Sequence, residues 1–311
     1  MINRDFKIII ITPVYEDVEA SKLLFADIKN KFNQDVYLVV IDDGSVKYPL
    51  KINCLEEENI SGVVLKLKSN VGHQRAIAIG LSYVAEFVHS HQNVVIMDSD
   101  GEDLPSSIFT MLQELKDYDV DVVFAKRKSR NESIQFKTFY IIYKTLFRVL
   151  TGRVIGFGNF MIINAKAVKS IVLIQECQIH FAAAILRSKL SKRVCPIDRG
   201  KRLAGHSKMN FIGLVLHGLK GLMVFAEEVL VRVGIASSFI AMFSIISAIT
   251  AISLKFYGIA SPGWFSISLG ILFIILLHTI TIALISLMTL MLIGVMRSNI
   301  DEKKLFYKDF L

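Results

Sequence analysis

Two long apolar segments near the C-terminus constrain this 311-residue chain more than any other feature of its sequence. They run roughly from Gly234 to Leu254 and from Phe265 to Val295, and each reaches the ~20 residues that cross the hydrocarbon core of a bilayer. The link between them contains Gly, Pro, Tyr and Trp, which are typical of turns at a membrane–water interface. The sequence therefore predicts a two-helix transmembrane hairpin at 233–297. Two buried helices of a soluble core are the alternative, and the near absence of charge over such lengths argues against them.

The charges that flank this hairpin predict its orientation. Basic residues precede the hairpin, and four more follow it, at Arg297, Lys303, Lys304 and Lys308. Cytoplasmic flanks of membrane spans are enriched in Lys and Arg, and an even number of spans leaves both ends on one side. We therefore expect a multi-pass protein of the cell inner (plasma) membrane with both termini, including a tail at 298–311, in the cytoplasm. The stretch 209–232 predicts an amphipathic juxtamembrane helix, which lies along the bilayer or docks on the preceding domain.

Residues 1–208 alternate between short apolar runs and amphipathic stretches. Runs typical of buried strands occupy 8–12, 36–41, 63–67, 94–98 and 120–125. Helical patterns occupy 17–33, 73–90, 105–117 and 134–151. This alternation predicts an α/β domain with a mostly parallel sheet that is covered by helices on both faces. Ligands bind beyond the carboxyl ends of the strands in such sheets, so the residues that follow each strand are the site candidates.

Charge and cysteine content narrow the class of partner. The formal net charge of +8 suits an anionic membrane surface or a phosphate-bearing substrate. We expect no nucleic-acid partner, because the sequence contains no basic helix or aromatic-basic sheet motif of the nucleic-acid-binding kind. The three cysteines, Cys54, Cys177 and Cys195, form no CxxC pair, which argues against a disulfide framework or a zinc site.

Acidic residues follow three of the predicted strands. The segments are TPVYED at 12–17, DDGS at 42–45 and DSDGED at 98–103. One acidic turn is commonly a helix cap, but three sets at the same sheet edge favour a shared cleft. A carboxylate at the end of an apolar strand, such as Asp98, is costly to bury unless it is paired or metal-bound. Mg²⁺ or Mn²⁺ prefers oxygen ligands and is often shared with substrate phosphates, so the sequence predicts a divalent cation here.

These segments, together with SNVGHQRAIAIGL at 69–81, resemble in order and spacing the family 2 glycosyltransferases. The resemblance covers about 6–208 and is to the polyprenyl-phosphate sugar transferases, such as dolichol-phosphate mannose synthase and the bactoprenol glucosyltransferases. It implies a GT-A, Rossmann-like catalytic domain at 1–208, followed by the membrane hairpin found in many bacterial members. It also implies an inverting transfer of sugar from a UDP- or GDP-sugar donor to polyprenyl phosphate.

The resemblance implies donor contacts that carry over by position. Pro13, Tyr15 and Asp17 match the family's P-x-Y-N-E segment, which touches the nucleotide, and Asp43 would hold the nucleoside. Here Glu16 replaces the usual Asn and Asp17 the usual Glu, so the contact is chemically similar but shorter.

The resemblance also implies the metal and phosphate sites. Asp98 and Asp100 match the DxD metal motif, Asp100 is expected to be catalytic, and Glu102 stands where a metal contact is often found. Lys126 and Arg127 match basic residues near the phosphates, and the R-x-x-G-x-S-K loop that closes over donor and acceptor is matched by Arg202, Ser207 and Lys208. Among these, Arg202 is the one expected to act in catalysis.

One departure from the family keeps the acceptor open. Many relatives with a phosphate acceptor read G-D-F-R where this chain has Gly158-Asn159-Phe160-Met161, and Asn159 cannot act as a base. We expect Asn159 to contact the substrate. An anionic phosphate acceptor needs no base, whereas a hydroxyl of a lipid-linked glycan does, and Glu176 is then the candidate. An inactive subunit that binds nucleotide sugar is a further alternative. The base and sugar of the donor also stay open, as does a homo-oligomer, since the helix at 134–151 could contact a neighbouring subunit, the membrane surface or the core.

Overall fold

The computed structural model describes residues 6–33, 35–128, 134–154, 156–205, 211–259, 261, 263–296 and 306–310. The chain divides into two compact units. The first unit comprises Met1–Lys144, Val154–Val224 and Asp301–Leu311, and the second comprises Thr145–Arg153 and Phe225–Ile300.

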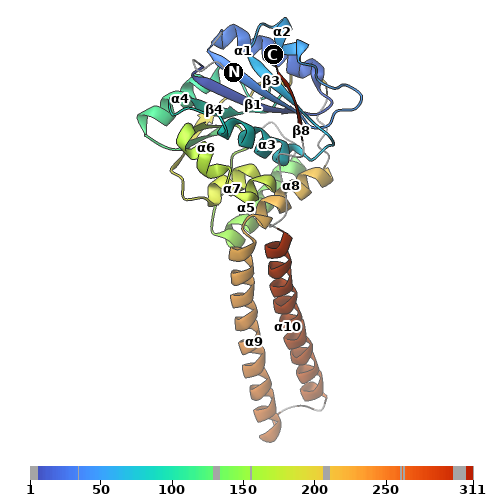
Figure 1. The fold of residues 1–311 in the computed structure, drawn as a ribbon. Helices are drawn as coiled ribbons and strands as arrows, with labels where there is room; N and C mark the ends of the chain where they lie inside the picture. The colour runs from blue at the N-terminus through green and yellow to red at the C-terminus, as the bar shows by residue number, and fades with distance from the viewer. Residues whose placement is uncertain are drawn as a thin grey trace. The chain divides into compact units, whose positions relative to one another are not determined.

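An eight-stranded sheet forms the centre of the first unit, in the order β7-β5-β6-β4-β1-β2-β3-β8 (Figure 1). Its strands are β1 (Ile8–Val14), β2 (Val36–Asp42), β3 (Gly62–Leu67), β4 (Asn93–Ile96), β5 (Val122–Arg127), β6 (Met161–Asn164), β7 (Lys192–Ile197) and β8 (Phe306–Phe310). The pairs β1–β2, β1–β4, β2–β3 and β5–β7 are parallel, which confirms the mostly parallel sheet. All five predicted strands are present. The sequence did not predict β6, which runs antiparallel between β4 and β5, or β7 and β8.

Helices cover both faces of this sheet. Those of the first unit are α1 (Val18–Phe32), α2 (Asn53–Glu57), α3 (His73–Ala85), α4 (Ser107–Asp117), most of α5 (Ile134–Thr151), α6 (Ala165–Ile171), the 3₁₀ helix η1 (Gln175–Gln178), α7 (Phe181–Arg187) and α8 (Phe211–Met223). On one face, Ile8 and Ile10 of β1 belong to the same buried cluster as Leu24 of α1. On the other face, Gly80 of α3 lies so close to the sheet that a Cβ there would be 2.8 Å from Ile11 Cγ2. Strands buried on both faces explain why β1 reads as a continuous apolar run.

The second unit contains α9 (Ala226–Phe256) and α10 (Trp264–Met296), which lie side by side (Figure 1). Both are long and apolar enough to cross a membrane. The small residues Ser237, Ser244 and Ala251 of α9 are buried and recur every seven residues, as expected where two apolar helices pack closely.

Two predicted boundaries differ from the structure. The stretch 209–232 is divided, because α8 ends at Met223 and α9 begins at Ala226. Within the predicted tail at 298–311, Phe306–Phe310 form β8, which pairs antiparallel with β3 and extends the sheet of the first unit. α8, which precedes the hairpin, and β8, which follows it, thus belong to the same unit.

Candidate active site

The three acidic segments lie at one edge of the sheet. Asp43 N donates to Val14 O at 2.8 Å, and Met97 N donates to Ile11 O at 3.1 Å. These bonds continue the parallel pairing of β1 with β2 and with β4 just past the strand ends. The segments that follow β1, β2 and β4 therefore leave the sheet as neighbours, as the sequence predicted.

Arg202 joins two of these segments. Its Nη2 donates to Asp17 Oδ2 at 3.0 Å, and its Nη1 donates to Asp100 Oδ2 at 2.9 Å. Hydrogen bonds between a guanidinium and a carboxylate are among the stronger ones in proteins. One planar group thus holds together a carboxylate that follows β1, a carboxylate that follows β4 and the loop before α8.

The loop that carries Arg202 lies directly on the DSDGED segment. Gly200 N donates to Glu102 O, and Leu203 N donates to Asp100 O, both at 2.9 Å. A Cβ at Gly200 would lie 2.5 Å from Gly101 O, so this approach requires a glycine. Gly101 itself has φ +83°, a conformation that side-chain-bearing residues rarely adopt.

Glu102 and Asp103 are also held by arginines. Arg199 Nε donates to Glu102 Oε2 at 3.1 Å, and Arg127 Nη2 lies 3.5 Å from the same oxygen. Arg127 Nη2 is also 3.7 Å from Asp103 Oδ1. Arg127 therefore contacts the acidic cluster, by which we mean the carboxylates of Asp98, Asp100, Glu102 and Asp103. Lys126 beside it is exposed at the end of β5. A metal contact by Glu102 stays a prediction.

Burial and crowding shift the pKa values of these carboxyls. Burial, and then the charge of Asp98, raise the pKa of Asp103 to about 8, and the same two causes raise the pKa of Asp100. Burial alone would raise the pKa of Asp98 as well, but His73, together with Arg127 and His217, outweighs burial, so the pKa of Asp98 lies below its usual value. Carboxylates packed this closely repel one another, and a cation between them relieves the repulsion.

His73 belongs to the segment 69–81 that carries the family resemblance, but no role of its side chain was predicted from the sequence. It is the first residue of α3, and its Nε2 lies 3.2 Å from Asp98 Oδ1 and 3.1 Å from Asn159 Nδ2. Burial lowers the pKa of His73, but the neighbouring Asp98, together with the charges of Asp43 and Asp103, outweighs burial, so the net shift is upward. Its place just after β3, at the sheet edge where ligands bind, is the signal that could have found it.

The residues present fit a divalent cation. Asp98 Oδ1 is buried and accepts no hydrogen bond of normal geometry, which is costly for a carboxylate oxygen unless a cation binds it. No group of three or more His, Cys, Asp or Glu side chains in the described part of the chain is arranged to hold a metal ion by itself. Mg²⁺ and Mn²⁺ are often completed by substrate phosphates, so a smaller set of protein ligands is sufficient.

The residues predicted to contact the donor occupy different environments in the structure. Pro13 lies within β1, and Tyr15 is 43% exposed. The carboxylate of Asp43 accepts hydrogen bonds from Val71 N at 2.8 Å and Gly72 N at 3.0 Å, so it fixes the turn before α3. Contact between Asp43 and a nucleoside stays a prediction.

Glu16, where the family has Asn, organises the loop after β2. Its carboxylate accepts hydrogen bonds from the backbone N–H groups of Val46, Lys47 and Tyr48 at 2.6 to 2.9 Å. Glu16 has φ 49°, which the surrounding bonds must stabilise. Its carboxylate therefore shapes the cleft through this loop.

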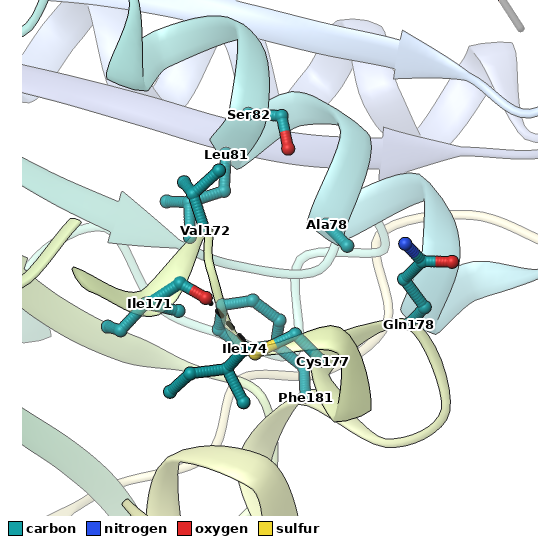
Figure 2. Close-up of a pocket in the computed structure, with 9 residues that line it drawn as sticks. All are labelled: Ala78, Leu81, Ser82, Ile171, Val172, Ile174, Cys177, Gln178 and Phe181. Atoms are coloured by element: carbon teal, nitrogen blue, oxygen red, sulfur yellow. Dashed lines mark hydrogen bonds between the residues drawn. The ribbon is translucent and has the colours of Figure 1, made fainter. Parts of the chain in front are cut away.

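Glu176 lies in η1, where its Oε1 pairs with Arg187 Nη1 at 2.7 Å. The neighbouring Cys177 and Gln178 line a small cavity between α3, α6 and η1 (Figure 2). Its volume of about 10 Å³ is too small for a sugar. A role of Glu176 as a base would require this ion pair to open. Ser207 and Lys208 lie outside the described residues.

Fold and site together define a class of enzyme. The chain is similar in structure to glucosyl-3-phosphoglycerate synthase from Mycobacterium tuberculosis, with a TM-score of 0.51 over 72% of this chain and 78% of that one. The sequence identity is 13%, so the likeness shows the fold, which is the GT-A fold of glycosyltransferases.

Sequence comparison gives the family. The model for glycosyl transferase family 2 matches residues 9–193, and the chain belongs to this family. It is 25% identical over 274 residues to CsbB of Bacillus subtilis, a glycosyltransferase by name, which covers 85% of this chain and 81% of CsbB. It is 24% identical over 219 residues to the undecaprenyl-phosphate 4-deoxy-4-formamido-L-arabinose transferase of Photorhabdus laumondii, covering 67% of this chain and 65% of that protein. The chain is thus a glycosyltransferase.

Proposed function

We propose that this glycosyltransferase moves a sugar from a UDP- or GDP-sugar to a polyprenyl phosphate at the cytoplasmic face of the membrane, with inversion at the anomeric carbon. The observation that carries the proposal is the bridge from Asp17 through Arg202 to Asp100. It gathers carboxylates from separate strand ends around one charged loop, in a chain with two membrane-length helices.

The acidic cluster supports a requirement for Mg²⁺ or Mn²⁺. Asp98 and Asp100 would hold the cation, because Asp98 Oδ1 is buried without a hydrogen bond and Asp100 is its neighbour in the cluster. When bound, the cation neutralises the charge that develops on a departing nucleoside diphosphate. The structural relative from Mycobacterium tuberculosis was solved with Mn²⁺ and uridine diphosphate.

The chain's own residues supply the remaining chemistry. An oxygen of the acceptor phosphate forms a bond to the anomeric carbon while the bond from that carbon to the nucleoside diphosphate breaks, so the electron pair leaves with the diphosphate. Arg202 and Arg127, which pair with Asp100 and Glu102, supply positive charge close to where the phosphates of donor and acceptor would bind. Lys126, next to Arg127 in the sequence, is exposed. The phosphate is anionic at neutral pH and needs no base, which suits a site with Asn159 and with Glu176 paired to Arg187.

The membrane assignment rests on connectivity and on relatives. Val224 before the hairpin and β8 after it belong to the same unit, as two crossings require. The relative from Photorhabdus laumondii is named for transfer to undecaprenyl phosphate, a lipid of the membrane. Anchoring keeps the enzyme at the surface where such an acceptor resides and raises its effective concentration.

The test is a transfer assay with the purified full-length protein. It would be incubated with Mg²⁺ or Mn²⁺, a panel of UDP- and GDP-sugars and polyprenyl phosphate, and mass spectrometry would identify the sugar phospholipid. We expect Asp100→Ala to lower kcat by at least about 10²-fold and chelation of the metal to abolish activity. Full activity of Asp100→Ala would contradict the metal assignment, and donor binding without turnover would point to an inactive binding subunit. Activity only with lipid-linked glycans, lost in Glu176→Gln, would instead establish a hydroxyl acceptor.

A further inference from the structure

The carboxylate oxygens of the acidic cluster differ in the hydrogen bonds that they accept. Asp100 Oδ1 accepts a hydrogen bond from Glu102 N at 3.0 Å, and Asp100 Oδ2 accepts one from Arg202 at 2.9 Å. The carboxylate of Glu102 is paired with Arg199. Asp98 Oδ1, in contrast, is buried and accepts no hydrogen bond. The carboxylate oxygen without a hydrogen bond is therefore Asp98 Oδ1, whose charged neighbour is the ring of His73.

A nitrogen faces this oxygen. His73 Nε2 lies 3.2 Å from Asp98 Oδ1. Neighbouring ligand atoms of an octahedral ion bound at ~2.1 Å are about 3 Å apart, so this spacing is the one that two ligands of a single cation adopt. The His73 side chain is 43% exposed, so a solvent-borne ion can reach the pair.

Asn159 adds a third polar atom at this position. Its Nδ2 lies 3.1 Å from His73 Nε2, while its Oδ1 is buried without a hydrogen-bond partner. The two ends of an amide are exchanged by a half turn, which would bring the oxygen toward the imidazole. Asp98, His73 and Asn159 thus come from three separate segments and meet at one place, where the half turn would present the Asn159 oxygen beside the other two side chains.

We propose that His73 is a ligand of the divalent cation, binding through Nε2 beside Asp98 Oδ1, with the Asn159 amide next to both. This inference rests on the proposed function, because it assumes that the enzyme binds such a cation. An imidazole ligand shifts a site from Mg²⁺ toward transition metals. The enzyme is therefore expected to bind Mn²⁺ more tightly than Mg²⁺.

The test reads the metal directly. The full-length protein in detergent would be titrated with Mn²⁺, with binding followed by electron paramagnetic resonance and ligand nitrogen detected by electron spin-echo modulation from ¹⁴N. We expect ¹⁴N modulation in the wild type, its loss in His73→Gln, and a Mn²⁺ dissociation constant in that variant raised by about tenfold or more. His91→Ala is the matched control, because His91 is exposed in the loop beyond the other end of α3, and it should keep both properties.

A variant that gains affinity for another metal ion provides a test that misfolding cannot imitate. In His73→Cys a thiolate replaces the imidazole, and soft ions such as Cd²⁺ prefer thiolates. The three native cysteines are buried, so we expect His73→Cys to bind Cd²⁺ at least about tenfold more tightly than the wild type. Mn²⁺ bound without ¹⁴N modulation, modulation retained in His73→Gln, or unchanged Cd²⁺ affinity in His73→Cys would overturn the proposal. Absence of Mn²⁺ binding in the wild type would instead count against the metal-dependent function itself.

Discussion

At the residue scale, the site depends on contacts between side chains far apart in the sequence. Asp17, Asp100 and Arg202 were each predicted as site residues from their segments. Their bridge was not, because Arg202 is 185 residues from Asp17 and 102 from Asp100, and only the fold brings them together. The pairing of Arg199 with Glu102 and the position of His73 were missed for the same reason. Residue types at strand ends indicate a cleft, but they do not indicate which groups within it bind one another.

The Arg202 bridge predicts a sharp difference between arginine and lysine. Arg202→Lys keeps the positive charge, but a single ammonium cannot hold two carboxylates with the flat geometry of a guanidinium. We expect kcat/KM of Arg202→Lys to fall by about 10- to 100-fold, as for loss of one aligned charged hydrogen bond. Steady-state kinetics of sugar transfer would measure this. Arg193→Lys is the control, since Arg193 pairs with Glu114 away from the cluster, and equal kinetics for both variants would count against the bridge.

At the scale of elements, the strands that the sequence revealed are those buried on both faces. β1 and β2 are continuous apolar runs with every residue buried. β6 has four residues, and β7 begins with Lys192 and Arg193 and is only partly buried, so neither carries a periodic signal. β8 lies beyond the hairpin and pairs with β3, a partner more than 200 residues away in sequence, which no local pattern predicts.

The cap of α7 predicts how stability depends on pH. His180 Nδ1 accepts a hydrogen bond from Ala183 N, and burial, then the neighbouring His217, lower the pKa of His180 to about 3. The other charged groups that act on it are His73 and Lys220, which lower its pKa further. Unfolded histidine has a pKa of about 6.5, so below that pH the unfolded chain binds a proton that the folded chain does not. Stability should therefore fall as pH drops from about 6.5 toward 3.

His180→Asn should weaken this dependence, since Asn also caps helices but does not titrate. Between pH 6.5 and 5 the free energy of unfolding should fall less steeply in the variant, by up to about 1.4 kcal/mol per pH unit for one proton. Thermal unfolding of the detergent-solubilised protein across this range would measure the slope. Parallel profiles for wild type and variant would rule out His180 as the titrating group.

At the scale of the whole molecule, the length of the two apolar segments and their lack of charge were sufficient to predict the hairpin. α9 and α10 contain both predicted spans, and both are almost free of burial within the protein, as lipid-facing helices are. What the sequence could not reveal is that residues beyond the hairpin rejoin the catalytic sheet as β8. The two proposed crossings require α8 and β8, which belong to one unit, to lie on the same side of the membrane.

Cysteine labelling in intact cells would test this topology. Cys54, Cys177 and Cys195 are buried, so single exposed cysteines can be introduced over a low background. Ser261 is exposed in the link between α9 and α10, and Lys47 is exposed in the loop after β2. A membrane-impermeant maleimide should label Ser261→Cys from outside the cell and Lys47→Cys only after lysis, because the basic flanks predict a cytoplasmic catalytic unit. Labelling of Lys47→Cys in intact cells would contradict the proposed orientation. It would also mean that the site has no access to cytoplasmic nucleotide sugars.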